Sequence, residues 1–179
     1  LGTLHEIIDL VIIDLRNNSG GKLPSESLGL SPLFEQPLIG ISCDNKNTFR
    51  KIRVTKNYFY FGDYLMDSLN YHSTLANKNK KIAILVSEKT VSAGEFLALA
   101  FKFQEDTKVF GSKTKGKTSH LRLFEFKSNA KLLLATDYYC DKNRNKIEGL
   151  IPDVECEKEE SLSKAIEWIK VPYNRENGR

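Results

Sequence analysis

The chain has 179 residues, of which 40% are hydrophobic and 28% are charged, and its formal net charge is +4. This length suffices for one domain with a sizeable core, and the composition is that of an ordinary globular domain. No apolar run approaches the roughly 20 residues needed to span a bilayer. The lysines are scattered among acidic residues, which argues against a nucleic-acid-binding surface.

The chain does not begin with methionine, and we interpret it as a fragment whose parent's targeting segment is not visible. Its three cysteines, Cys43, Cys140 and Cys156, are an odd number without metal-ligand spacing. We therefore expect buried or incidental thiols, no metal site and no cofactor.

Short apolar runs alternate with helical patterns along the chain. Residues 4–10, "LHEIIDL", predict the end of a helix that leads into a strand. Residues 10–15, "LVIIDL", predict a strand that is apolar on both faces, as in a buried parallel sheet, and the turn "NNSGG" ends it. The later predicted elements are a buried strand at 81–86, an apolar helix at 92–103, a strand at 108–111, a strand pair at 121–126 and 131–139, a proline-containing loop at 149–157 and a helix at 161–170.

This alternation predicts a layered α/β domain over residues 1–170, followed by a polar tail at 171–179. The segment from about 44 to 80 fits the alternation least, because it is dense in tyrosine and phenylalanine. We interpret it as an insertion that forms a surface hairpin followed by a helix. The alternative is a lid or a wall of a peptide-binding groove, where aromatic side chains provide contact area at low entropic cost.

The stretch "EKTVSAGEFLALAFK" places Ser92 where a buried strand runs into the apolar helix. A serine there commonly caps the helix. It is also in position for nucleophilic attack, because such a turn exposes the side chain and aims free N–H groups at the same point. An oxyanion formed by attack from Ser92 could then be bound by the Ala93 amide.

The two glycines of "NNSGG" allow backbone geometry that is closed to other residues. The amide of Gly21 is the expected second oxyanion donor, and the loss of one such donor typically costs several kcal/mol of transition-state stabilisation. A plain glycine turn is the alternative interpretation.

A serine nucleophile needs a base. Lys117 lies 25 residues after Ser92 and could fold back onto the helix start. A lysine base must be neutral, which requires burial or nearby positive charge. Lys113, Lys115 and Lys117 alternate along the chain as residues on one face of a strand do. The alternative interpretation is a solvated basic loop without a catalytic role. The histidines lack the spacing of triad members and are expected to be structural or exposed: His5, His72 and His120.

Together these stretches resemble the C-terminal processing (tail-specific) serine peptidase family, from Asp14 to about Glu155. "DLRNNSGG" is similar to its strand-and-turn motif, "EKTVSAGE" to its nucleophile motif, "VFGSKTKGK" to its Gly-x-x-Thr-x-Gly-Lys segment and "GLIPDVE" to its Gly-Ile-x-Pro-Asp segment. The resemblance implies a ClpP/crotonase-like α/β core that here lacks its N-terminal part. It also implies a nucleophile, two oxyanion-hole amides and, in the Ser/Lys branch, a general base: Ser92, Gly21 and Ala93, and Lys117.

Three other stretches, "GLSPLF", "FKFQEDTKVFG" and "ATDYYCDKNRNKIEG", resemble the nisin-resistance-protein-like branch. That branch pairs its serine with a histidine upstream of the "DLR" strand, which implies that Lys117 is not catalytic and that this fragment alone is inactive. The tricorn-like branch also uses an upstream histidine, together with a glutamate near the end of the core, for which Glu148 is the candidate. Lys117 and an upstream histidine both stay open as the base.

The leading hypothesis is a serine endopeptidase that cleaves peptides or unfolded proteins through an acyl-enzyme on Ser92, with the substrate added as a strand beside a sheet edge. The alternative is a non-catalytic peptide- or ligand-binding module on the same fold, with a pocket lined by Tyr58, Tyr60 and Tyr64. The nisin-resistance-like stretches suggest a peptide-resistance or peptide-sensing role. The family resemblance implies an extracytoplasmic location, with membrane attachment only through a segment outside this chain and no nucleic-acid partner.

Overall fold

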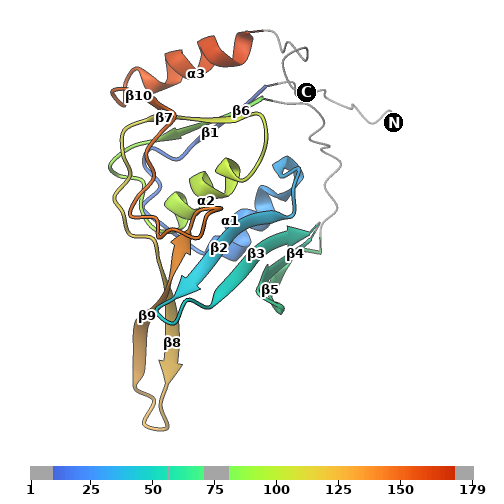
Figure 1. Cartoon of the computed structure of the whole chain (residues 1–179), viewed down its shortest axis with the longest axis vertical. Coiled ribbons are helices and arrows are strands. Elements are labelled where there is room, and N and C mark those ends of the chain that lie inside the picture. Colours follow the sequence, from blue (N-terminus) through green and yellow to red (C-terminus); the bar gives the residue numbers. More distant parts are fainter. Residues whose placement is uncertain (1–9, 56, 71–80, 172–179) are drawn as a thin grey trace.

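The computed structural model describes residues 10–55, 57–70 and 81–171, and its elements stack in layers (Figure 1). Helix α3 covers one face of a parallel sheet, helices α1 and α2 lie on the other side of that sheet, and a second, antiparallel sheet packs beyond α2. The predicted layered α/β architecture is confirmed.

The parallel sheet has the strand order β1-β6-β7-β10. Its strands are β1 Leu10–Asp14, β6 Lys81–Val86, β7 Thr107–Gly111 and β10 Val154–Glu155. In β6 every residue from Ile82 to Val86 is buried, because helices cover both faces of the sheet. Three of the strands are confirmed predictions. The loop prediction at 149–157 is wrong for β10, whose two residues are too few to show a hydrophobic period.

Three α-helices and one 3-10 turn complete this part of the fold: α1 Leu23–Gly29, η1 Ser31–Leu33, α2 Ala93–Lys102 and α3 Ser161–Lys170. Helices α2 and α3 confirm the prediction, whereas α1 and η1 were not predicted. Helix α2 is buried on all sides from Ala93 to Phe101, because it lies between the two sheets. A substrate could therefore reach this helix only at its ends.

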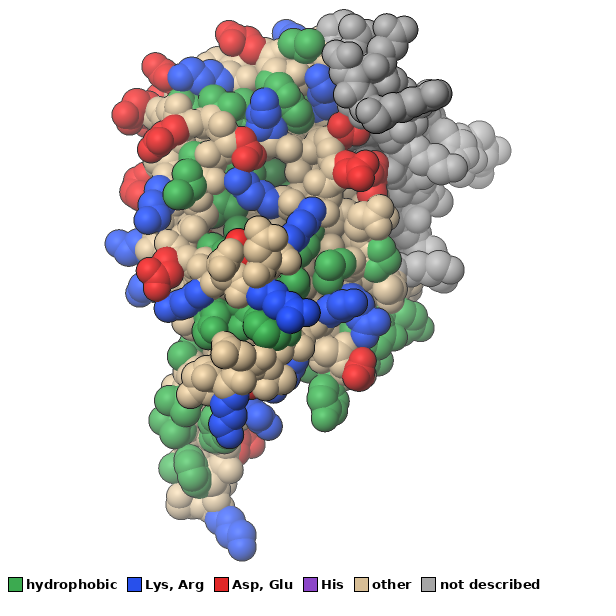
Figure 2. Space-filling view, viewed as in Figure 1, with side chains coloured by type: hydrophobic (Ala, Val, Ile, Leu, Met, Phe, Trp, Pro, Cys, Tyr) green, Lys and Arg blue, Asp and Glu red, His purple; other side chains and the backbone are tan. Residues whose placement is uncertain are grey.

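The antiparallel sheet has the order β5-β4-β3-β2-β9-β8. Its strands are β2 Leu38–Asp44, β3 Phe49–Thr55, β4 Tyr58–Phe61, β5 Tyr64–Ser68, β8 Ser119–Glu125 and β9 Lys131–Cys140. The predicted strand pair is confirmed as β8–β9, which projects from the body with hydrophobic side chains along it (Figures 1 and 2). The hairpin expected in the aromatic segment is present as β3–β4–β5. Tyr64–Ser68 pair with β4 as a strand. The helix expected after the hairpin had no stated bounds, and residues 71–80, which follow these strands, lie outside the described residues.

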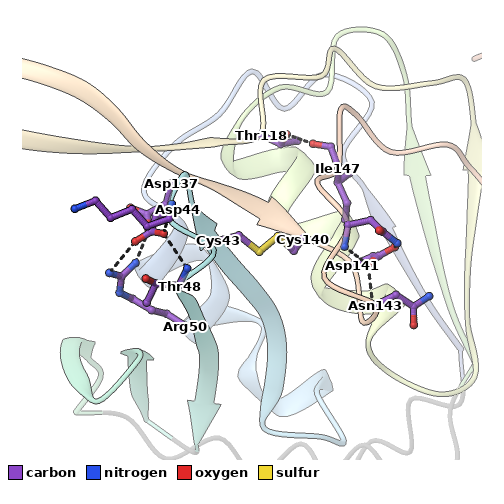
Figure 3. The surroundings of a disulfide bond; sticks show 12 residues. Cys43, Asp44, Thr48, Arg50, Thr118, Asp137, Cys140, Asp141, Asn143 and Ile147 are labelled. Carbon is purple, nitrogen blue, oxygen red and sulfur yellow. Dashed lines mark hydrogen bonds and ion pairs between the residues drawn. A yellow bond between two sulfur atoms is a disulfide. The ribbon is translucent and has the colours of Figure 1, made fainter.

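Two of the cysteines are bonded, which corrects the expectation of three thiols. Cys43 of β2 and Cys140 of β9 form a disulfide between neighbouring strands, and both are fully buried (Figure 3). Beside it, Arg50 bridges Asp137 at 2.6 Å and Asp44 at 3.5 Å. The sequence separation of 97 residues hides this pairing from any local pattern. Cys156 is a free, partly buried thiol.

Several sequence expectations lie outside the described residues, namely the helix end at 4–10 apart from Leu10, His5, His72 and all but the first residue of the tail at 171–179. In the part of the chain that is described, no helix has the length and apolarity to cross a bilayer. Within the same residues, no group of His, Cys, Asp and Glu side chains is arranged to hold a metal ion.

Candidate active site

Ser92 occupies the turn between β6 and α2 with a strained backbone. Its φ of 52° and ψ of −116° lie outside the extended region that an ordinary N-cap residue adopts. Such a conformation costs about 1–3 kcal/mol and persists only where surrounding contacts impose it. Ser92 therefore lies at the N-cap position, as the helix-capping interpretation expects. Its backbone is nevertheless strained, and the residue is partly exposed.

The "NNSGG" turn lies directly against Ser92. The backbone carbonyl of Asn18 accepts a hydrogen bond from the Val91 amide at 2.9 Å, and the Asn18 side-chain oxygen accepts one from the Gly20 amide at 2.9 Å. A methyl group added at Gly20 would lie 3.1 Å from Ser92 Cβ and 3.7 Å from Ser92 Oγ. Two segments about 70 residues apart in the sequence thus meet at the serine hydroxyl.

The two predicted oxyanion donors are the amides of Ala93 and Gly21. The Ala93 amide is the first N–H of α2, where helix geometry leaves donors free, and it has no acceptor among the described residues. The Gly20 amide is bonded to Asn18, whereas the Gly21 amide has no acceptor among the described residues. A Cβ added at Gly21 would lie 1.7 Å from Glu26 Oε1, so Gly21 packs against the Glu26 side chain. Both amides thus have free hydrogen-bonding capacity, and their role as an oxyanion hole stays a prediction.

The loop from Thr114 to Lys117 is fixed to the same turn by Glu95. The Ser92 amide donates to Glu95 Oε2 at 3.0 Å, and the Lys117 amide donates to the same oxygen at 2.8 Å. The backbone of Lys117, the predicted base, thus lies close to Ser92, the predicted nucleophile.

The side chain of Lys117 is nevertheless exposed, as are those of Lys113 and Lys115, whereas Thr114 and Thr118 are buried. All three lysines are exposed, and they lie on a loop rather than on a strand. A lysine that acts as a base requires burial or neighbouring positive charge, and burial is absent at Lys117.

The "DLR" and "GLIPD" motifs support this arrangement rather than face the serine. Arg16 pairs with Asp14 at 2.6 Å and donates to the Lys158 carbonyl just before α3. The hydrogen bond from Arg16 keeps the pKa of the Asp14 carboxyl below its usual value. The Leu150 amide donates to Thr114 Oγ1 at 2.7 Å. The "GLIPD" segment is thereby hydrogen-bonded to the loop from Thr114 to Lys117, the lysine loop.

His120 is structural, as expected. Its ring stacks on Phe96 at 4.7 Å and meets the edge of Phe61 at 5.3 Å, with Tyr139 beyond. Desolvation in this aromatic cluster lowers the pKa of His120 to about 4, and its Nε2 has no hydrogen-bond partner. Glu148, the tricorn-like candidate, is exposed and pairs with Lys146, which lowers its pKa.

The three tyrosines of the alternative binding hypothesis do not enclose a pocket. Tyr58 is 47% exposed and Tyr64 is 74% exposed, and Tyr60 lies under the Arg53 guanidinium. Their outward orientation gives the pure binding module little support from this structure.

Sequence reasoning missed two residues that build the site, Asn18 and Glu95. The spacing Ser92-x-x-Glu95 is that of a capping box, a signal that could have identified Glu95. Asn18 had no such signal, because one of its hydrogen-bond partners, Val91, is distant in the sequence.

A layered α/β core with a strained serine at a strand-to-helix turn, packed against a glycine turn, has the architecture of a serine-type peptidase. Residues 4–156 match the family model described as peptidase family S41, and the chain belongs to this family. The resemblance to C-terminal processing peptidases is thereby confirmed.

Similar sequences carry related descriptions. The chain is 29% identical over 165 residues to the nisin-resistance protein of Lactococcus lactis subsp. lactis, a match that covers 89% of this chain and 49% of that protein. It is 28% identical over 149 residues to the chloroplastic carboxyl-terminal-processing peptidase 2 of Arabidopsis thaliana, covering 82% of this chain and 26% of that protein. The chain thus spans half or less of the curated relatives it matches.

Solved structures show the same fold. A lipoprotein from Streptococcus agalactiae matches with a TM-score of 0.72 and 24% identity over 90% of this chain and 54% of its own. The photosystem II D1 C-terminal processing protease matches with a TM-score of 0.62 and 18% identity, over 90% of this chain and 39% of its own. At these identities the likeness concerns the fold.

Proposed function

We propose that this chain carries the nucleophile and the oxyanion hole of a serine endopeptidase that acts on peptides or unfolded protein segments. The observation that supports it is the turn at Ser92, where a strained serine lies against Gly20 of the glycine turn and directly before the free amide of Ala93. Membership of a peptidase family supports the same reaction class.

The proposed reaction has two halves. Ser92 Oγ attacks the scissile carbonyl while a base takes its proton, and the oxyanion receives hydrogen bonds from the two amides. The protonated base then gives its proton to the leaving amine as the tetrahedral intermediate collapses to the acyl-enzyme. Water attacks the ester with help from the same base and regenerates the serine.

We propose that a histidine outside the described residues is the base, because the Lys117 side chain lies in solvent. The 29% identity to a nisin-resistance protein supports this choice, because the resemblance to that branch implies a serine paired with an upstream histidine. Lys117 is the second candidate, because its amide shares an acceptor oxygen with that of Ser92.

Covalent labelling with a fluorophosphonate, followed by peptide mapping, tests the nucleophile. The test uses the natural full-length protein, so that a base from sequence beyond residues 1–179 is present. We expect the label on Ser92 and none in Ser92→Ala, with unchanged thermal unfolding. Wild-type protein that stays unlabelled would contradict a peptidase and favour a binding module. Lys117→Met should keep the labelling rate, and a loss of about 100-fold would assign the base to Lys117.

The names of two similar proteins motivate a proposal on location and substrate. One is a nisin-resistance protein and another is a lipoprotein, and we propose that this chain works at the cell envelope on peptides that arrive there. The disulfide supports an oxidising compartment outside the cytosol. Incubation with lanthionine-containing and linear peptides tests the substrate. Preference for the lanthionine peptides is expected, and equal or exclusive cleavage of the linear ones would argue against it.

A further inference from the structure

Glu95 is a fully buried carboxylate at the centre of the site that takes no part in the proposed proton transfers. Each of its oxygens accepts two hydrogen bonds. Oε1 accepts from Thr114 Oγ1 at 2.6 Å and from the Gly116 amide at 2.7 Å. Oε2 accepts from the Ser92 amide at 3.0 Å and from the Lys117 amide at 2.8 Å.

The four donors come from two separate segments, the serine turn and the loop from Thr114 to Lys117. Three of them are backbone N–H groups, which can donate but not accept. Both oxygens at position 95 must therefore be acceptors, with at least one N–H facing each of them. A carboxylate meets this requirement, whereas a carboxamide of the same shape would turn its NH₂ group toward an N–H in either orientation.

Two features of the site depend on these bonds. Ser92 keeps a strained backbone, and its amide is oriented by Glu95 Oε2. The loop carries Thr114, whose hydroxyl also accepts the Leu150 amide. Glu95 thus connects the serine turn, the lysine loop and the "GLIPD" segment through one buried group.

We propose that Glu95 is a positioning residue that holds Ser92 in its reactive conformation and sets the distance between the serine turn and the Thr114–Lys117 loop. This inference rests on the proposed serine peptidase function. It assigns to Glu95 a role in the rate of acylation rather than in substrate affinity, because Glu95 is buried beneath the site.

The test compares Glu95→Gln with wild type in the full-length protein. We expect the maximal rate of fluorophosphonate labelling at Ser92 to fall about 100-fold, the cost of a small displacement of a reacting group, while the concentration for half-maximal rate stays within about threefold. Amide hydrogen exchange at Ser92, Gly116 and Lys117 should accelerate together. Wild-type labelling and wild-type exchange in Glu95→Gln would overturn the inference.

Matched variants separate positioning from general destabilisation. Gln104→Ala removes a buried amide that bonds Gln36 and Leu38 far from the serine, and it should lower thermal stability without slowing the labelling of folded protein. Thr114→Val removes one bond to Glu95 and should slow labelling about 10-fold, whereas Thr114→Ser should restore it. If Glu95→Gln does not fold, the Thr114 pair decides, and equal rates in that pair would overturn the inference.

Failure of the proposed function is recognisable separately. If wild-type protein is not labelled, the peptidase proposal fails, and amide exchange in Glu95→Gln still decides whether Glu95 holds the serine turn and the loop together. Unchanged exchange at Ser92 and Lys117 would then remove Glu95 from the arrangement altogether.

Discussion

Replacing Gly20 by alanine tests whether the glycine turn and the serine turn form one site. Gly20 has a φ of +108°, a conformation that residues with a side chain rarely adopt. An alanine Cβ would also lie 3.1 Å from Ser92 Cβ and 3.4 Å from the Val91 carbonyl oxygen. Either the turn or the serine must therefore move.

The two effects can be estimated. The backbone strain amounts to about 1–3 kcal/mol, and crowding in a packed site adds about 1–3 kcal/mol. For a chain of this size, a loss of about 2–6 kcal/mol corresponds to a decrease in Tm of about 4–24 °C. Displacement of Ser92 or of the Gly21 amide should slow labelling of the folded protein about 100-fold.

Gly29→Ala is the matched control. Gly29 ends helix α1, and no atom would lie within 4 Å of an added Cβ. This substitution should leave labelling unchanged and alter the free energy of unfolding by less than about 1 kcal/mol. Differential scanning calorimetry and a fluorophosphonate time course measure both variants. If Gly20→Ala kept the wild-type Tm and labelling rate, the close approach of the two turns would be refuted.

Two further predictions concern stability. Because burial lowers the folded-state pKa of His120 to about 4, below about 6.5 in the unfolded chain, its contribution to stability is complete above pH 6.5 and is lost as the pH falls toward 4. Denaturant unfolding should lose about 2 kcal/mol from this group between pH 7.5 and pH 5, and His120→Phe should abolish that loss; an unchanged pH dependence would contradict the burial. Reduction of the Cys43–Cys140 bond should lower the free energy of unfolding by about 2–5 kcal/mol. Denatured, unreduced protein should expose one reactive thiol, that of Cys156, and a count of three would refute the disulfide.

Local sequence patterns were sufficient to predict the elements that are buried on all sides. The run "KIAILV" is buried on both faces, and the helix from Ala93 to Lys102 is apolar all round, so hydrophobicity alone identifies them. The glycine pair before Lys22 and the serine before a helix could likewise be predicted as a tight turn and a helix start, because each depends on residue types within its own short stretch. These local features suffice to indicate the peptidase family.

Other features have no local signature. Strand β5, Tyr64–Ser68, belongs to the aromatic segment, in which a hairpin and a helix were expected without bounds, and its pairing with β4 decides its conformation. The strand β10 is too short to predict, and α1 is only seven residues long. In these cases strand pairing, or a very short length, outweighs intrinsic propensity.

The sequence by itself determined the family and the layered α/β class and predicted Ser92 as the nucleophile, because these follow from residue types in a fixed order along short stretches. Only the tertiary structure decided how the stretches meet. It placed the four donors around Glu95, brought Asn18 to the serine turn, bonded Cys43 to Cys140 and left the Lys117 side chain in solvent. Contacts between residues tens of positions apart depend on how whole sheets and helices pack, and no short pattern encodes that packing.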